Sequence, residues 1–350
     1  MTLVRTLLGE QSLAVWIVLG IIGFALTWKG ANVVEVTTEK LSDHYGVSQA
    51  IQGSLIVAVA TSFPELAIIV ISVLLLGEFG VGAGALIGTA VFNILVIPGA
   101  VALTAGTTTT TRGIVYRDAL FYIVAILGFF AVIALGILST DGPEVATVSP
   151  AMGVGLLCLY AVYVILIVEG RRNSDTDVTR TETAVGRQVG RFLGGLGIIL
   201  VGVESMVTMT VEIAAALGAP PFLISVTVLS VLSSFPDLLV GVKMGQGGDR
   251  KAAMANVFGT NTFNLVGAFP IGIILAGGIS VSFLTSVPLL LFLFYSTLVV
   301  IVAAATDFEL TRREGALLVG LYLLFLLWMV SEATGYTAYL TEQTLESVLV

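Results

Sequence analysis

The sequence contains very few of the residues on which redox, thiolate and imidazole chemistry depends. Cys158 is the single cysteine and lies inside an apolar run, so neither a disulfide framework nor a thiolate metal site can be built. His44 is the single histidine, and we interpret it as a solvated loop residue because it stands in a polar stretch beside Asp43 and Tyr45. Zinc and copper sites, which draw on these ligands, are therefore not expected.

Charge is scarce as well. Charged residues make up 11% of the 350 residues, the formal net charge is −8, and the basic residues do not cluster with interleaved aromatic residues, so we expect no nucleic-acid partner. Hydrophobic residues, in contrast, make up 57% of the chain, and the mean hydropathy is +1.06. No water-soluble core of this length requires so much apolar surface, so the lipid bilayer is the expected solvent for most of it.

The apolar residues fall into ten stretches, each long enough to cross a bilayer at about 20 residues per span. The first has one preceding arginine, Arg5, but no small-residue cleavage site follows it, so we interpret it as a helix and not as a removed signal. The expected fold is an all-α membrane protein with ten transmembrane helices. The spans lie near 12–34, 49–76, 81–105, 118–138, 148–168, 192–217, 222–244, 252–276, 281–304 and 314–334.

The loops differ in charge between the two faces of the membrane. Glu78, Asp141 and Glu144 occupy loops without a compensating base, whereas the loops after the odd-numbered spans collect every basic residue except Arg5. The positive-inside rule then predicts a multi-pass cell-membrane protein with both termini outside the cytoplasm. The basic residues in the cytoplasmic loops are Lys29, Lys40, Arg112, Arg117, Arg171, Arg172, Arg180, Arg187, Arg191, Lys243, Arg250, Lys251, Arg312 and Arg313.

The chain repeats itself. When the sequence is aligned with itself, the run Thr61-Ser62-Phe63-Pro64-Glu65-Leu66 pairs with Ser233-Ser234-Phe235-Pro236-Asp237-Leu238, and after a shift of one position Gly88-Thr89-Ala90-Val91-Phe92-Asn93 pairs with Gly259-Thr260-Asn261-Thr262-Phe263-Asn264. Each half contains five spans. Because five is odd, the second copy begins on the opposite side of the membrane, so the sequence predicts two inverted five-helix repeats, 1–168 and 192–350, joined by a cytoplasmic linker, 169–191.

Inverted repeats have a mechanical meaning. Two similar halves related by an axis in the membrane plane can exchange conformations and so open the two faces in turn, which is alternating access. A passive channel needs no such exchange, so the repeat favours a carrier over a channel.

Two acidic residues carry the strongest chemical signal. Glu65 and Asp237 lie in the interior of apolar spans with no lysine or arginine near them in sequence, where a carboxylate costs about 2.5 kcal/mol or more. Each follows a proline, Pro64 or Pro236, which removes a backbone donor and interrupts the helix. A helix broken beside a carboxylate, in both copies, predicts an ion site near the middle of the membrane.

The residues around these acids all offer oxygen. An all-oxygen set without histidine or thiolate suits hard cations such as sodium or calcium, and two carboxylates neutralise one divalent ion. We expect no cofactor and no enzymatic activity. The candidate ligands are the side chains of Thr61, Ser62, Glu65, Thr89, Asn93, Ser233, Ser234, Asp237, Thr260 and Asn264, with carbonyls freed near Ala58 and Ser230.

The paired motifs resemble the two alpha repeats of the cation/calcium exchanger superfamily, specifically its sodium/calcium exchangers, and the resemblance covers the whole chain. It implies an antiporter that exchanges sodium for calcium, with a bundle of eight helices and a separate sliding pair formed by the first and sixth spans. Glu65 and Asp237 would be the main calcium ligands. The hydroxyls of Thr61, Ser62, Ser233 and Ser234 and the carbonyls near Ala58 and Ser230 would serve sodium, and Asn93, Asn264, Thr89 and Thr260 would complete the set.

The chain departs from the family pattern in its second repeat. Prokaryotic members often have Thr-Ser-Leu-Pro-Glu in both repeats, whereas this chain has the shorter acid Asp237, and Ser230 replaces a usual alanine. Asn264 stands where potassium-dependent members have an aspartate, so the fixed negative charge is lower and potassium is not expected to be transported.

Three other functions are weighed against the exchanger. Proton-coupled exchangers of the superfamily usually have a Gly-Asn-x-x-Glu pattern, which is absent here, so proton coupling remains the alternative. A passive cation channel would use the same buried acids without a counter-ion. An intramembrane aspartyl protease would resemble Tyr-Asp and Gly-x-Gly-Asp patterns, which are missing.

Overall fold

The computed structural model describes residues 3–9, 11–47, 52–138, 145–171, 182–337 and 339–340. Within them, nine helical segments are long and apolar enough to cross a membrane. The one predicted span that is not among these nine is the second in the chain, 49–76. It is divided into shorter helical pieces that follow one another from Gln52 to Leu76. The predicted loop acids Asp141 and Glu144, the linker residues Arg172 and Arg180, and the end of the second repeat lie outside the described residues.

The first half contains α1 (Leu3–Leu8), α2 (Leu13–Tyr45), the divided span η1, α4, α5 and η2 (Gln52–Ile56, Val57–Thr61, Phe63–Ile71, Ser72–Leu76), α6 (Phe79–Ala105), β1 (Thr108–Thr109), η3 with α7 (Ile114–Ala119, Leu120–Leu138), β2 (Val145–Val148) and α8 (Pro150–Arg171). The second half contains α9 (Val185–Leu217), α10, η4 and α11 (Pro221–Ile224, Ser225–Leu229, Ser230–Gln246), α12, η5 and α13 (Arg250–Phe263, Asn264–Ala268, Phe269–Leu275), β3 (Ile279–Ser282), α14 (Phe283–Ala305), β4 (Glu309–Leu310) and α15 (Arg312–Ala333).

The connection between the halves is shorter than the predicted linker, 169–191. Helix α8 continues to Arg171, and α9 begins at Val185. The arginines at 187 and 191 therefore lie on the first turns of α9 and not in a loop. A helix can extend beyond the apolar core because its polar end turns are solvated at the membrane surface.

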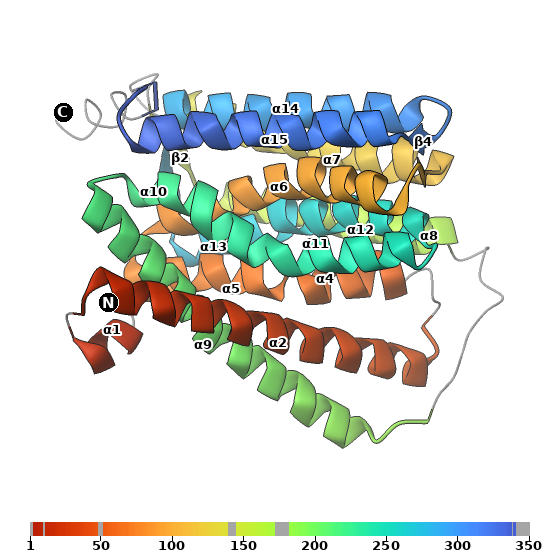
Figure 1. The fold of residues 1–350 in the computed structure, drawn as a ribbon, viewed down its shortest axis with the longest axis horizontal. Coiled ribbons are helices and arrows are strands. Elements are labelled where there is room, and N and C mark those ends of the chain that lie inside the picture. The colour runs from red at the N-terminus through yellow and green to blue at the C-terminus, as the bar shows by residue number, and fades with distance from the viewer. Residues whose placement is uncertain are drawn as a thin grey trace.

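Two short strand pairs display the inverted repeat. β1 pairs with β4, and β2 pairs with β3, both antiparallel. The pairs lie at opposite ends of the molecule (Figure 1). The register that aligns the Gly88 motif with the Gly259 motif also aligns Thr108 in β1 with Ile279 in β3. The two strand pairs are therefore equivalent elements of the two repeats, in opposite orientations. The predicted inversion is therefore seen in the fold.

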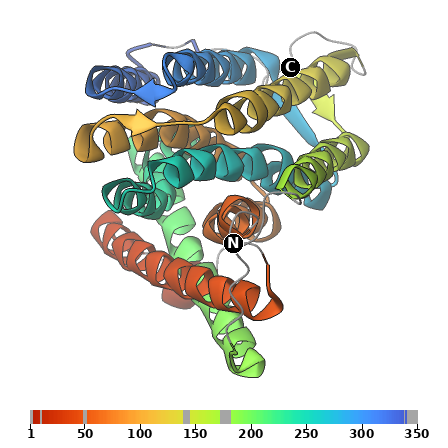
Figure 2. The same cartoon turned by 90° about the vertical axis from the view of Figure 1, so that its right-hand side faces the viewer.

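Helices α2 and α9 form a crossing pair at one side of the bundle (Figures 1 and 2). Each is 33 residues long. Their backbones meet at two pairs of glycines. A Cβ added to Gly23 or to Gly202 would lie 2.5 Å from the carbonyl oxygen of the other residue, and a Cβ added to Gly30 would lie 2.8 Å from the carbonyl oxygen of Gly195. The register that aligns the two repeats takes one of these glycine pairs onto the other, so the two contacts are equivalent. Small residues permit this close approach of the helices.

We expect Gly202→Leu to disrupt this crossing. The side chain would collide with the backbone of α2 and destabilise the fold by about 1–3 kcal/mol, lowering the thermal unfolding temperature in detergent. Gly197→Leu is the matched control on the same helix, because nothing lies within 4 Å of an added Cβ there. Equal unfolding temperatures for the two variants would contradict the packing.

The short helix α1 lies against α9. The backbone N–H of Val4 donates to Glu204 at 2.9 Å, and Arg5 pairs with Glu212 at 3.3 Å. Both acids of the sixth span therefore have structural partners in α1.

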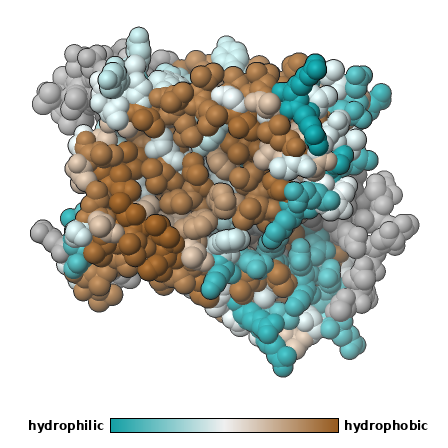
Figure 3. Space-filling model, viewed as in Figure 1, coloured by the Kyte–Doolittle hydropathy of each residue, from teal (hydrophilic) through white to brown (hydrophobic). Residues whose placement is uncertain are grey.

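The core and the surface are divided as a membrane protein requires. Helices α6 and α12 with α13 are buried along most of their length. Apolar side chains of the outer helices, such as Val302 and Leu327, are 66% exposed. The hydrophobic surface covers most of one face, and hydrophilic residues gather toward one end (Figure 3). The central helices carry the repeated motifs, so the bundle places both motifs at its centre.

Candidate cation site

The first motif interrupts its helix, as the proline predicts. Helix α4 ends at Thr61, Ser62 leaves helical geometry with φ −87° and ψ 5°, and α5 restarts at Phe63 with Glu65 in its first turn. The carbonyl of Ala58, expected to be free, instead accepts the Ser62 hydroxyl at 2.7 Å and the Thr61 hydroxyl at 3.2 Å. Because these hydroxyls use their protons on the carbonyl, their lone pairs remain available to a cation.

The second motif does not interrupt its helix. Helix α11 continues through Pro236, so the expected break in this copy is wrong. A π-helical turn, η4, leads into α11, as η1 leads into α4 in the first copy. The hydroxyl of Ser233 donates to the carbonyl of Ser230 at 3.2 Å, which repeats the contact between Thr61 and Ala58.

Polar side chains join the repeats directly. Thr89 on α6 lies 3.1 Å from the hydroxyl of Ser233 and accepts the hydroxyl of Ser234 at 3.0 Å. One turn further along α6, the amide of Asn93 donates to Asp237 at 3.5 Å. The third span of the first repeat therefore completes the acid motif of the second, which sequence spacing alone could not place.

The equivalent residues around Glu65 are buried but less well satisfied. Helix α12 packs against α4, and the side chains of Glu65, Thr260 and Asn264 are each 1% exposed. Within the described residues, both carboxylate oxygens of Glu65, the Thr260 hydroxyl and both polar atoms of the Asn264 amide have no hydrogen-bond partner. Buried polar atoms are rarely left unpaired, and the carboxylate, hydroxyl and amide oxygens among these atoms are of the kind that bind a cation.

The two acids belong to one site. Glu65 lies within electrostatic reach of both Asp237 and Ser233. Asp237 is 3% exposed. Among the described residues, no group of three histidine, cysteine or acidic side chains is placed to hold a metal. Asp237 also lies within electrostatic reach of Glu35, which lines the same cavity. All of the predicted residues are buried: Ala58, Thr61, Ser62, Glu65, Thr89, Asn93, Ser230, Ser233, Ser234, Asp237, Thr260 and Asn264.

One residue at the centre was not predicted. Asn261 donates from its amide to the carbonyl of Ala90 at 3.0 Å. Ala90 and Asn261 occupy the same position in the motifs that begin at Gly88 and Gly259. The hydrogen bond between them therefore lies where the two repeats meet. The signal was present in the motif comparison, since the second copy has a buried amide where the first has alanine.

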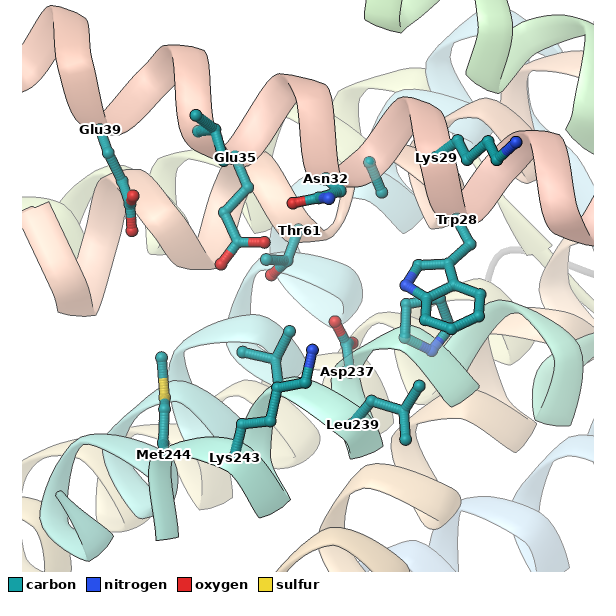
Figure 4. A pocket seen from close by; sticks show the side chains of 14 residues that line it. Trp28, Lys29, Asn32, Glu35, Glu39, Thr61, Asp237, Leu239, Lys243 and Met244 are labelled. Atoms are coloured by element: carbon teal, nitrogen blue, oxygen red, sulfur yellow. The ribbon is translucent and has the colours of Figure 1, made fainter. Parts of the chain in front are cut away.

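A cavity of about 550 Å³ leads to Asp237 from the surface between α2 and α11 (Figure 4). Its exposed lining includes Lys29 and Asn32, so it connects the buried acid with the outside. Glu35 lines it as well, so α2 borders the passage to the acid. The full lining is Trp28, Lys29, Ala31, Asn32, Glu35, Val36, Glu39, Thr61, Pro236, Asp237, Leu239, Val240, Lys243 and Met244.

Lys243 corrects the sequence-based assignment. The sequence predicts that it lies in a loop, but it is on α11 and extends into the same cavity as Asp237 (Figure 4). Pro236, Val240 and Lys243 follow the helical period and therefore share one face of α11. Side chains on a helix also lean toward its N-terminus, which turns the long lysine side chain back toward the acid.

The equivalent route on the other repeat is closed. The register that aligns the two acid motifs takes Glu35 to Val207 and Lys243 to Ile71. Val207 and Ile71 are buried in one apolar cluster with Ile68 and Val203, where α5 packs against α9. The site is therefore open along one of two equivalent routes.

A family model described as sodium/calcium exchanger protein matches residues 15–168 and 188–331. The uncharacterized membrane protein MJ0091 of Methanocaldococcus jannaschii is 25% identical over 309 residues, which cover 87% of this chain and 94% of the relative. The sodium/calcium exchanger MaX1 of Methanosarcina acetivorans is 27% identical over 154 residues, 42% of each chain. A solved structure of the sodium-calcium exchanger NCX_Mj, soaked with Na⁺ and Sr²⁺, shares the fold with a TM-score of 0.63 and 21% identity, over 89% of this chain and 98% of that chain.

Proposed function

The chain belongs to the sodium/calcium exchanger family, and from this premise we propose that it is an antiporter that exchanges sodium for calcium by alternating access. The coarser function, cation exchange by a multi-pass membrane transporter, follows from the family and from the membrane-spanning helices. The choice of ions and the mechanism are the proposal.

The observation that carries the proposal is the buried pair Glu65 and Asp237. In the membrane interior a carboxylate requires a compensating charge, and the oxygens of Glu65 have no partner among the described residues. Two carboxylates match the charge of one calcium ion. When calcium is absent, sodium ions supply the same charge, so the two cations compete for the same oxygens.

The proposed ligand set takes each residue by its place in the two motifs. We assign Glu65 and Asp237 to calcium, with Asn93, Asn264, Thr89 and Thr260 completing the oxygen shell. The hydroxyls of Thr61, Ser62, Ser233 and Ser234, with the carbonyls of Ala58 and Ser230, would serve sodium. This division is supported by the hydroxyl–carbonyl pairs that recur in both motifs.

The open and closed routes support alternating access. The cavity between α2 and α11 lies toward the C-terminal ends of these helices, near the predicted cytoplasmic bases Lys40 on α2 and Arg250 just after α11, so we assign it to the cytoplasmic face, with both termini outside the cytoplasm. The equivalent outer route is closed by packing of α5 on α9. Exchange of these two arrangements between the repeats would open the outer face and close the inner one.

Labelled calcium uptake into vesicles tests the ions. Vesicles that contain the purified protein and are loaded with sodium should take up calcium when sodium is absent outside, and uptake should stop when the sodium gradient is removed. Uptake driven by an imposed proton gradient instead would assign the chain to proton-coupled exchange. Uptake indifferent to both gradients would indicate a passive channel and contradict the proposal.

Potassium should not be required. A monovalent cation bound beside calcium needs an additional carboxylate, whereas Asn264 supplies an oxygen dipole without net charge. We expect sodium-driven calcium uptake to proceed in potassium-free vesicles, and Asn264→Asp to alter cation affinity or introduce sensitivity to potassium. An absolute potassium requirement in the unmodified protein would refute the assignment of Asn264.

A further inference from the structure

The cavity that leads to the site contains a fixed positive charge. Lys243 extends from α11 into the space between Glu35 on α2 and Asp237 (Figure 4). Within the described residues, salt bridges occur at Arg5 and at Arg117, and none is found at Lys243. The ammonium group therefore stands in the passage without a carboxylate in direct contact, and Glu35 is an acid within electrostatic reach of it.

The other charges that face this passage come from both packed helices. Helix α2 contributes Lys29, Glu35 and Glu39, and α11 contributes Asp237 in addition to Lys243. The acids of α2 attract cations toward the passage. Lys243 is the basic residue placed on the helix that bears the site carboxylate, so its charge acts on an ion that approaches or leaves Asp237.

This charge has no counterpart on the other route. The equivalent residue, Ile71, is 5% exposed and packs in the apolar cluster with Val203 and Val207. The position equivalent to Lys243 therefore contributes no charge to the opposite route. The two routes differ in electrostatics at this pair of positions.

The effect of a fixed charge depends on the charge of the ion. The electrostatic free energy between the fixed charge and an ion is proportional to the charge of the ion, so it is twice as large for calcium as for sodium. The factor by which the fixed charge weakens calcium binding is therefore the square of the factor for sodium. A unit charge about 7 Å away in a water-like dielectric weakens monovalent binding by about threefold and divalent binding by about ninefold. Salt reduces both factors.

We propose that Lys243 is a tethered cation that weakens binding from the cavity side of the membrane, and weakens calcium binding more than sodium binding. The residue thereby makes the two faces of the exchanger unequal and promotes release of calcium into the cavity. This inference rests on the proposed sodium/calcium exchange, since it concerns the same site.

The test measures half-saturating concentrations of sodium and calcium on each face, in inside-out and right-side-out membrane vesicles. Lys243→Met should lower the half-saturating concentration of calcium about ninefold and of sodium about threefold on the cytoplasmic face, with little change on the other face. The differences should shrink as ionic strength rises. Lys243→Arg, which keeps the charge, should behave like the unmodified protein.

Lys251→Met is the matched control, because Lys251 is an exposed lysine near the same end of the bundle but does not line the cavity. Equal changes for sodium and calcium, equal changes on both faces, or the same behaviour in Lys243→Met and Lys251→Met would overturn the inference. Absence of sodium-dependent calcium uptake in the unmodified protein would instead refute the proposed function.

Discussion

Glu65→Gln is expected to abolish sodium-driven calcium uptake. The side chain is 1% exposed, and its two oxygens have no hydrogen-bond partner in the part of the chain that the structure describes. Removing its charge leaves a divalent ion with one compensating carboxylate in a low-dielectric site, which costs about 3–5 kcal/mol, or a loss of calcium affinity of at least about 100-fold. Initial rates of labelled calcium uptake and equilibrium calcium binding measure the effect.

Glu78→Gln provides the control for this substitution, because Glu78 is an exposed acid at the start of α6. It should transport calcium as the unmodified protein does. Because glutamine keeps the shape of glutamate without its charge, the Glu65→Gln protein should remain folded. Its unfolding temperature in detergent should be close to that of the unmodified protein. Near-normal exchange by a folded Glu65→Gln protein would remove Glu65 from the site.

Asp237→Asn is expected to be as severe, and Asp237→Glu much milder. The carboxylate of Asp237 receives the amide of Asn93 at 3.5 Å and lies at the inner end of the cavity. Asparagine removes the charge, whereas glutamate restores the acid that stands in the first motif and changes the reach by one methylene. We expect the asparagine variant to lose calcium uptake by about 100-fold or more.

The comparison of these two variants separates charge from shape. If Asp237→Glu loses transport as completely as Asp237→Asn, position 237 tolerates one geometry, and the loss in the asparagine variant no longer identifies a charged ligand. Retained transport in the glutamate variant, with an altered calcium affinity, supports the ligand assignment.

Much of the fold was predictable because its two halves repeat. Apolar length predicted the spans, and an odd number of spans per copy predicted their inversion. The break at Ser62 followed from Pro64, since proline lacks the N–H that continues a helix. The same argument was wrong for Pro236, because α11 continues through this residue as one helix.

The residues that sequence reasoning missed are those whose role depends on the packing of one repeat against the other. Asn261 reaches the carbonyl of Ala90 because the two motifs cross at the centre. Lys243 stands near Asp237 on α11, so the sequence-based statement that no lysine lies near this acid was wrong, and its position in the cavity depends on how α2 packs across α11. Helical period could have placed Lys243 beside Pro236, but no sequence pattern indicates which face borders a cavity.

The central claim is coupled exchange, and it is tested most directly by measuring both ions in the same vesicles. Vesicles loaded with labelled sodium and placed in labelled calcium should lose sodium and gain calcium together. Omitting calcium outside should stop the sodium loss, and omitting sodium inside should stop the calcium gain. Calcium entry that continues at an unchanged rate without internal sodium would contradict the account, because a site shared by the two cations cannot return without its counter-ion.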